Sequence, residues 1–196
     1  MARIGIFSGT FDPVHKGHIA FCRAALEEAS LDRIVLLPEP EPRGKAHAAP
    51  LAHRRAMLEL AVQEEPQLSV LQLGGKRFTV AGTLPELERL LPGEELSLLL
   101  GSDIVRSFEA GWPNLGELLK RMRLVIGLRA HDSQGDVEAV LARVRQQTGV
   151  APRYAVIGSP LAHTASTTIR THQATRQVTP RVAAYIAAHQ LYATPA

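Results

Sequence analysis

The residues best suited to chemistry in this sequence are two histidines near its start, His15 and His18. They close the segment of residues 8–18, which has the sequence SGTFDPVHKGH and directly follows a short apolar run. A helix is expected to begin within the pair, after the break that the Asp-Pro step imposes. The two rings, three residues apart, then share one face of the first helical turn. Imidazole N–H groups, the Thr10 hydroxyl and the N–H groups of a helix start can all donate hydrogen bonds to phosphate oxygens.

This set of donors favours transfer of a phosphoryl-type group, which depends on positioning and charge neutralisation more than on a protein nucleophile. A His-x-x-His pair alone is more often structural than functional, and only the full segment makes it specific. A zinc site would need a third ligand at a recognisable spacing. The sequence shows none, so no metal held by the protein's own side chains is expected.

A second polar segment, at residues 163–170, combines Ser166 and Thr167 with Arg170. The two hydroxyl residues are suited to capping a helix, and an arginine one turn later is suited to binding phosphate through parallel hydrogen bonds. Taken alone, the segment is better explained as an ordinary capped helix with a surface arginine. It gains significance only beside residues 8–18.

The composition is that of an ordinary globular protein. The chain has 196 residues, 45% of them hydrophobic, which predicts one domain over residues 1–196. A net charge of +3, scattered arginines and 5% aromatic residues argue against a nucleic-acid partner. No apolar run approaches the roughly 20 residues that cross a membrane, and no signal peptide is recognised. The single cysteine, Cys22, excludes an intrachain disulfide, so a cytoplasmic location is expected.

Short apolar runs alternate with amphipathic stretches, which predicts parallel strands connected by helices. Strands are expected at residues 3–7, 33–37, 68–71, 96–100, 124–128 and 154–157. Helices are expected at residues 16–29, 51–64, 84–91 and 136–147, and from about residues 166 and 180. Thr83 is the expected cap of the third helix, with Pro85 in its first turn. The fold class is therefore α/β: a single Rossmann-like, doubly wound parallel sheet with helices on both faces.

Ligands bind such sheets at the carboxyl ends of the strands, near the point where the strand order reverses. The two polar segments both follow strands, so we expect them to face one crevice. Helices from about residue 163 are expected to complete a nucleotide site there.

The sequence GTFDPVHKGH at residues 9–18 resembles the G-T-F-D-P-x-H-x-G-H signature of the bacterial nicotinate-nucleotide adenylyltransferase family, part of the HxGH nucleotidyltransferase superfamily. TASTTIR at residues 164–170 resembles the second superfamily signature, I-S-S-T-x-I-R, except at its first two positions. The resemblance covers nearly the whole chain. It includes HRRAML at residues 53–58, Lys45 in the preceding loop, GSD at residues 101–103, Trp112, and the ending at residues 182–192.

The resemblance implies adenylyl transfer from ATP to nicotinate mononucleotide, giving deamido-NAD and pyrophosphate, with Mg²⁺ bound mainly through the ATP phosphates. The implied catalytic residues are His15, His18, Lys45 and Arg170. The residues implied to bind ATP are Ser8, Gly9, Thr10, Phe11, Gly17, Gly101, Asp103, Ser166 and Thr167. The residues implied to bind the acceptor are Arg54, Thr79, Thr83 and Trp112. Some of these also have a structural explanation: a solvated Arg54, a helix cap at Asp103, and packing of Trp112.

Two departures from the family bear on the acceptor. RFTVAGTL stands at residues 77–84, where the family has S-Y-T-x-D-T-L, so the acid is missing. Pro113 stands where a main-chain N–H helps to bind the nicotinate carboxylate in the family, and proline has no N–H. A nicotinamide-nucleotide or phosphopantetheine adenylyltransferase, and a catalytically weak nucleotide-binding protein, stay open as alternatives. The oligomeric state, a homo-oligomer included, and closure of the loop around Lys45 as a lid stay open too.

Overall fold

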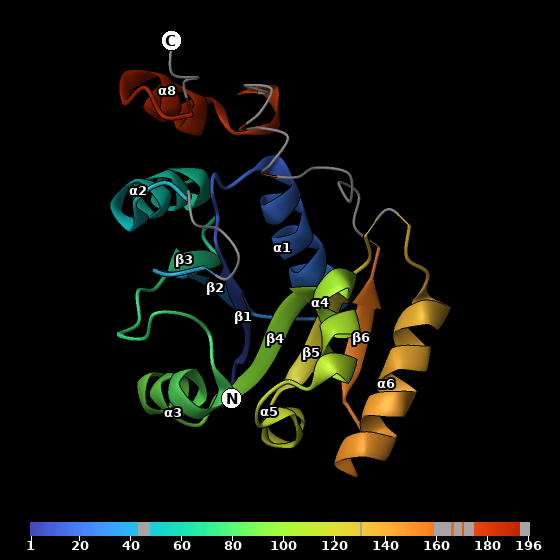
Figure 1. The fold of residues 1–196 in the computed structure, drawn as a ribbon. Coiled ribbons are helices and arrows are strands. Elements are labelled where there is room, and N and C mark those ends of the chain that lie inside the picture. Colours follow the sequence, from blue (N-terminus) through green and yellow to red (C-terminus); the bar gives the residue numbers. More distant parts are fainter. Residues whose placement is uncertain (43–47, 130, 159–165, 167–169, 171–174, 193–196) are drawn as a thin grey trace.

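A six-stranded parallel sheet forms the centre of the fold, seen here in a computed structural model that describes residues 1–42, 48–129, 131–158, 166, 170 and 175–192. The strands are β1 (Arg3–Gly9), β2 (Arg33–Pro38), β3 (Leu68–Val70), β4 (Glu95–Gly101), β5 (Arg123–Gly127) and β6 (Tyr154–Ile157). Their order in the sheet is β3-β2-β1-β4-β5-β6, with every neighbouring pair parallel (Figure 1). The central strand β1 places Ile6 opposite Val35 of β2 and Leu98 of β4.

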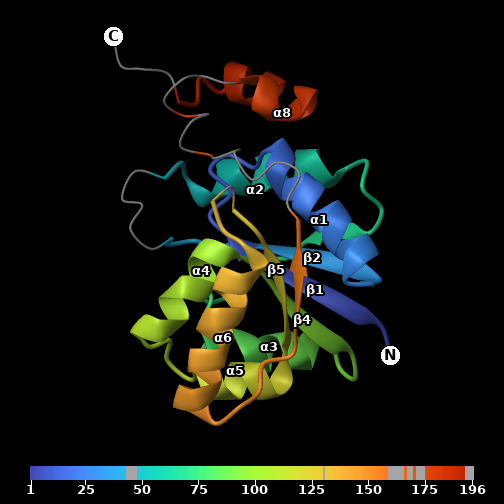
Figure 2. The same cartoon turned by 90° about the vertical axis from the view of Figure 1, so that its right-hand side faces the viewer.

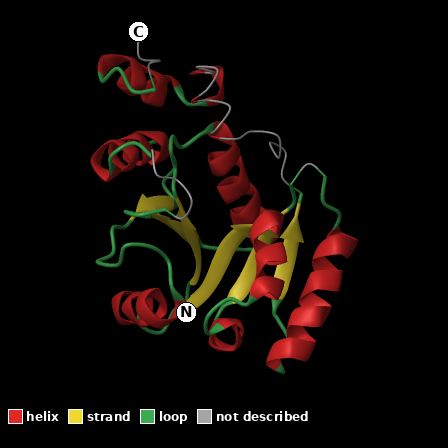
Figure 3. Cartoon of the chain, viewed as in Figure 1, coloured by secondary structure: helices red, strands yellow, loops and turns green. Residues whose placement is uncertain are grey.

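Helices cover both faces of this sheet, because each central strand is apolar on both of its sides. One face carries α1 (Lys16–Glu28) and α2 (Leu51–Val62), with α8 (Pro180–Ala188) packed on α2. The other face carries α3 (Val80–Leu90), α4 (Ser102–Ser107), α5 (Leu115–Arg121) and α6 (Gln134–Thr148). Figure 2 shows the sheet between these two layers, and Figure 3 shows α8 on the side of α2 away from the strands. Two 3-10 turns, Phe108–Ala110 and Thr175–Gln177, complete the described elements.

The predicted fold class is confirmed, and each predicted strand is present with its ends shifted by two residues or fewer. The start of α3 was predicted wrongly. Its cap is Thr79, not Thr83, because the extended Thr79 accepts the N–H of Gly82 at 3.2 Å. Thr83 lies inside the first turn, where its hydroxyl accepts the Thr79 N–H at 3.0 Å, and Pro85 lies further into the helix. The short helices α4 and α5 were not foreseen in the polar stretch around Trp112.

The strand order reverses between β1 and β4, since the chain moves outward from β1 to β3 and then returns to the other side of β1. The loops that leave the carboxyl ends of these two strands separate there, which opens a crevice for a ligand. Within the described ranges, no helix combines the length and apolar composition needed to cross a membrane.

Candidate active site

The first turn of α1 is closed by a reciprocal pair of hydrogen bonds between His15 and His18. His15 is the N-cap, and its Nδ1 accepts the backbone N–H of His18 at 3.3 Å. In return, Nδ1 of His18 accepts the backbone N–H of His15 at 3.2 Å. The two rings stack with their centroids 3.6 Å apart and an interplanar angle of 21°. The histidines therefore take the part that a serine and a glutamate usually play in a capping box.

This arrangement fixes which nitrogen of each neutral ring carries its proton. A ring nitrogen that accepts a hydrogen bond has no proton of its own, so the proton of each neutral imidazole resides on Nε2. Each ring then has its Nε2–H donor on the edge opposite the cap. Because both rings belong to the positive end of a helix, those donors add to a local field that favours an anion.

A cavity of about 420 Å³ lies at the carboxyl ends of β1, β2, β4 and β5. The predicted site residues that line it are Ser8, Gly9, Thr10, Phe11, His15, Gly17, His18, Gly101, Asp103, Trp112 and Ser166. Sequence reasoning missed Glu39, Phe78 and Arg129, which line the same cavity. Lys45 and Thr167 lie outside the described residues. The cavity thus brings together most of the residues expected on the ATP side.

Three residues expected on the acceptor side do not line this cavity: Arg54, Thr79 and Thr83. Thr79 and Thr83 instead close the first turn of α3: the Thr83 hydroxyl accepts the Thr79 N–H, and the Thr79 hydroxyl accepts the Gly82 N–H. Arg54 is 1% exposed. Its guanidinium donates to the carbonyl oxygens of Ala49 at 2.7 Å, Thr10 and Glu39 at 2.8 Å, and Pro40 at 3.1 Å.

Arg54 is therefore not the solvated residue that the sequence allowed, and its guanidinium is buried among carbonyl oxygens and does not line the cavity. Burial lowers the pKa of Arg54, and the nearby Asp12, Tyr192 and Glu39 oppose that effect. Four carbonyl bonds compensate a buried cation that would otherwise be costly. The side chain joins the loop after β1 to the loop after β2 at Thr10 and Glu39, two residues that line the cavity.

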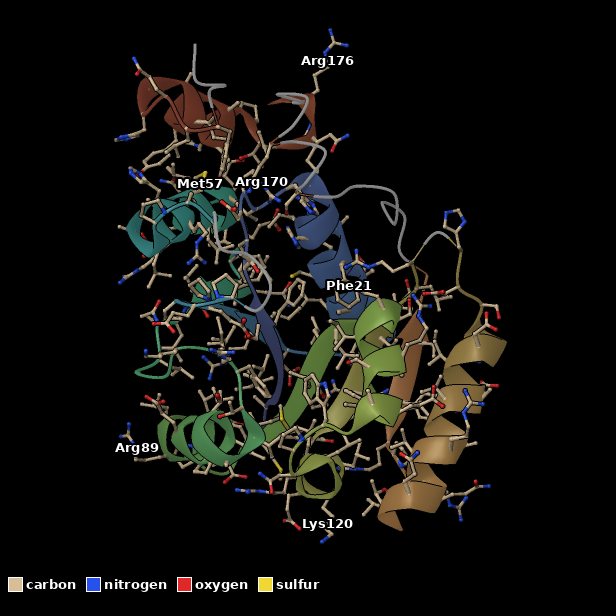
Figure 4. All side chains as sticks on the ribbon, viewed as in Figure 1. Phe21, Met57, Arg89, Lys120, Arg170 and Arg176 are labelled. Atoms are coloured by element: carbon tan, nitrogen blue, oxygen red, sulfur yellow. The ribbon has the colours of Figure 1, made fainter. Side chains whose placement is uncertain are left out.

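The two polar segments meet at one place, as their positions after strands predicted. Ser166 donates its hydroxyl to the carbonyl oxygen of Pro13 at 3.1 Å. Nη1 of Arg170 donates to the carbonyl oxygen of Asp12 at 2.6 Å and lies 3.6 Å from its carboxylate. Figure 4 shows Arg170 beside the end of α1 at which that helix begins. Ser166 lines the cavity, whereas Arg170 lies just behind the loop that precedes α1.

On the β4 side, a hydrogen-bonded chain fixes Asp103 and Arg129. The buried hydroxyl of Ser102 accepts the backbone N–H of Arg129 at 2.9 Å and donates to the carboxylate of Asp132. Nε of Arg129 donates to Asp103 at 2.9 Å across Gly101. A Cβ atom at Gly101 would lie 2.2 Å from that Asp103 carboxylate, so a side chain there would displace the pair. Asp103 is thus ion-paired and not a helix cap with free oxygens.

Two further residues of the cavity are the carboxylate Glu39, which follows β2, and the indole Trp112, which follows α4. Oε1 of Glu39 accepts the Ser8 hydroxyl and the backbone N–H of Phe78, each at 3.1 Å. The ring of Trp112 packs edge-on against Phe108, with centroids 4.9 Å apart, and its Nε1–H donates to Ser107. Trp112 therefore both packs against the core and faces the cavity.

A single positional signal would have found the missed charged residues. Glu39 follows the last residue of β2, and Arg129 comes two residues after the end of β5. Like Asp103 after β4, both thus lie within two residues of the carboxyl end of a strand. In a doubly wound sheet this is where ligand-binding residues gather.

The sheet order and the histidine-capped cavity at its switch point together define the class of Rossmann-like nucleotidyltransferases. The model of the cytidylyltransferase-like family matches residues 6–174. Curated relatives named "Probable nicotinate-nucleotide adenylyltransferase" include one from Neisseria meningitidis serogroup A, 31% identical over 98% of this chain and 99% of its own length. Another, from Albidiferax ferrireducens, is 33% identical over 99% of this chain and its full length.

The fold also matches a solved structure at lower sequence identity. The Plasmodium falciparum nicotinic acid mononucleotide adenylyltransferase, solved in complex with NaAD, superposes with a TM-score of 0.79. That match covers 98% of each chain at 17% identity, so it shows a shared fold and no more. The chain belongs to the cytidylyltransferase-like family and, within it, to the nicotinate-nucleotide adenylyltransferases.

Proposed function

We propose that this enzyme transfers the adenylyl group of ATP to the phosphate of nicotinate mononucleotide, in the biosynthesis of NAD. The observation that carries this proposal is the stacked His15–His18 pair at the start of α1, which faces the cavity in a chain whose full-length relatives bear that activity in their names. An oxygen of the mononucleotide phosphate forms a bond to the α-phosphorus of ATP. The bond from that phosphorus to the bridging oxygen of the β-phosphate breaks, and pyrophosphate leaves.

The chain's own residues would act by positioning and by neutralising charge. The Nε2–H groups of His15 and His18 would donate to phosphate oxygens of ATP, where negative charge grows as pyrophosphate departs. Thr10 and the backbone around Gly17 would add further donors. Arg170 would supply positive charge behind the same loop, and we assign Lys45 the same task from its own loop.

The remaining cavity residues divide between the two substrates. We assign Ser8, Gly9, Phe11, Gly101, Asp103, Ser166 and Thr167 to ATP. We assign Trp112 to the acceptor as a stacking surface, Phe78 as a further apolar contact and Arg129 as a cation for the acceptor phosphate. A neutral serine or cysteine nucleophile is not required, and the buried thiol of Cys22 has its pKa raised by burial, which keeps it protonated.

Mg²⁺ fits this site as part of the nucleotide. Among the described residues, no group of three or more His, Cys, Asp or Glu side chains is arranged to hold a metal ion. Mg²⁺ commonly keeps several waters and binds through substrate phosphates with one or two carboxylates. We propose that it enters with ATP, near the Asp103 carboxylate, and neutralises charge on the leaving pyrophosphate.

A second acceptor, nicotinamide mononucleotide, is favoured by one specific observation. The Glu39 carboxylate lines the cavity, and Pro113 supplies no N–H beside Trp112. A negative wall disfavours an anionic ring substituent and accepts a hydrogen bond from an amide. The nicotinate form stays our first assignment because relatives that align with nearly the whole chain are named for it.

Pyrophosphate release from MgATP tests these assignments with three acceptors: nicotinate mononucleotide, nicotinamide mononucleotide and phosphopantetheine. Preference for the first confirms the proposal, and preference for the amide replaces the substrate while keeping the reaction. Binding of ATP without turnover of any acceptor would indicate a nucleotide-binding protein without the enzymatic role. We expect the reaction to take place in the cytoplasm, without a nucleic-acid or membrane partner, and the assembly state is to be read from the same preparation by light scattering.

A further inference from the structure

The carboxylate of Asp12 is a buried junction between four parts of the chain. The residue is 1% exposed. Its Oδ1 accepts the backbone N–H of Ala49 at 3.2 Å and the hydroxyl of Tyr192 at 2.7 Å. Arg170 lies 3.6 Å from Oδ2 and donates to the carbonyl oxygen of the same residue. One side chain therefore joins the loop before α1, the start of α2, the second polar segment and the residues after α8.

Tyr192 is held in place to deliver its hydroxyl to this junction. It follows α8 with a backbone φ of +60°, in the left-handed region that bulky side chains rarely adopt. Such a conformation persists only where the surroundings impose it. The ring packs against the apolar cluster of α1, α2 and α8, which leaves the hydroxyl as its polar contact with Asp12. Burial, followed by the bond to Asp12, raises the pKa of Tyr192 well above its ordinary value, so the hydroxyl keeps its proton and donates.

The hydroxyl matters because two guanidinium groups, of Arg54 and Arg170, lie near this one carboxylate. Arg54 is committed to four carbonyl oxygens, so Arg170 is the guanidinium that forms an ion pair with the Asp12 carboxylate. If Tyr192 stopped donating, Oδ1 would lose one of the two donors it has among the described residues, and a buried carboxylate with too few donors is strongly unfavourable. The carboxylate would then turn toward the cation beside it, Arg170.

We infer that Tyr192 is a positioning residue for adenylyl transfer. By satisfying Asp12, it keeps that carboxylate from pulling Arg170 out of the place where the guanidinium supports the loop before α1. The histidine donors follow that loop directly, so their position depends on it. The residues after α8 thus contribute to nucleotide binding without touching the nucleotide.

The chain offers a matched control, because a second tyrosine fastens the same helix. Tyr185 of α8 bonds through its hydroxyl to Nδ1 of His53 in α2 at 3.0 Å, away from Asp12. Tyr192→Phe and Tyr185→Phe each remove one hydroxyl and keep the ring. If both hydroxyls only fasten α8 and the residues after it to the rest of the fold, the two variants lose similar thermal stability and bind ATP alike.

The experiment measures ATP affinity by calorimetry, together with KM for ATP and kcat. We expect Tyr192→Phe to weaken ATP binding on the order of tenfold, as loss of a hydrogen bond to a charged group predicts, and to raise KM for ATP. Tyr185→Phe should stay within about twofold of the parent. Equal ATP affinity of Tyr192→Phe and the parent, with both folded by circular dichroism, overturns the inference.

A double-mutant cycle with Arg170→Lys tests whether Tyr192 affects ATP binding through Arg170. The losses from Tyr192→Phe and Arg170→Lys should be less than additive if the tyrosine acts through Arg170. Full additivity would show that Tyr192 does not act through Arg170.

The kinetic measurements rest on the proposed function, whereas the measurement of ATP binding does not. A chain that binds ATP but turns over no acceptor would therefore defeat the proposed function and still test the role of Tyr192.

Discussion

Nδ1 of His15 and Nδ1 of His18 each accept the other residue's backbone N–H, so one pair of side chains both starts α1 and faces the cavity. Ordinary capping residues satisfy the helix with an oxygen on a short side chain, so their other polar atoms stay close to the helix end. An imidazole has a second nitrogen on its far edge. The structure therefore couples the start of a helix to the orientation of two phosphate donors.

The two tasks of His15 can be separated by choice of substitution. Asparagine is a strong N-cap whose oxygen can replace Nδ1, but it does not reach the position of Nε2. We expect His15→Asn to change the free energy of unfolding by less than about 0.5 kcal/mol and to lower kcat at least about 100-fold. His15→Ala should lower kcat similarly and also lose about 1 kcal/mol of stability. Urea unfolding and pyrophosphate release measure both quantities. Activity of His15→Asn near that of the parent would contradict the catalytic assignment.

Arg54 and its neighbour Arg55 form a natural comparison in α2. Arg54 is buried on four carbonyl oxygens, whereas Arg55 is exposed and pairs with Glu59 one turn later. We expect Arg54→Met to lower the free energy of unfolding by about 2–4 kcal/mol, since several buried carbonyl groups lose their donor. Arg55→Met should cost less than about 0.5 kcal/mol. Urea titration of both variants is the measurement, and equal stabilities would refute the supporting role of Arg54.

Glu39 provides a test of the charge that faces the acceptor. Glu39→Gln keeps an oxygen that can accept from Ser8 and Phe78 and removes only the negative charge. We expect KM for nicotinate mononucleotide to fall by roughly 2–10-fold and KM for nicotinamide mononucleotide to change less, because only the first carries an extra carboxylate. The control is Glu41→Gln, whose side chain pairs with Lys76 outside the cavity. An unchanged ratio of the two KM values would remove Glu39 from acceptor selection.

Asp132 makes a pH-dependent contribution to stability. The Ser102 hydroxyl, followed by Arg106, lowers the pKa of Asp132 in the folded protein. A carboxyl group whose pKa is lower in the folded than in the unfolded chain stabilises fully above its unfolded value, about 4. That stabilisation is lost as pH falls through the folded value. We therefore expect Asp132→Asn to reduce Tm at pH 7 and to weaken the fall in Tm between pH 5 and 3. Parallel Tm curves for the two proteins would contradict this.

The parallel sheet, its six strands and the motif residues of the cavity followed from the sequence because their signals are local. Apolar runs such as residues 96–100 mark buried strands, and the glycine, proline and histidines of residues 9–18 lie within one loop and one helical turn. The crevice shared with Ser166 also followed, since both segments come after strands.

What the sequence concealed depends on distant partners. Nothing near Arg54 in the chain shows that Thr10 and Glu39 will meet its guanidinium, and a basic residue next to another basic residue is typical of an exposed helix face. Pro85 favours a position in the first turn of a helix, which made Thr83 the expected cap, whereas α3 begins one turn earlier at Val80. Arg129 and Glu39 carry no motif of their own, so only the sheet places them at the site.

The pairing of β1 with β4 has a consequence for the order of events during synthesis. Arg3 lies opposite Glu95, so the walls of the crevice come from segments made far apart in time. At a translation rate of about 5–20 residues per second, β1 waits several seconds for its second neighbour. Until then the histidine loop has one wall only, and ATP has no pocket to enter. ATP binding therefore cannot stabilise a chain whose synthesis has not passed β4. Until β4 is made and paired, the apolar face of β1 must be kept from binding other molecules.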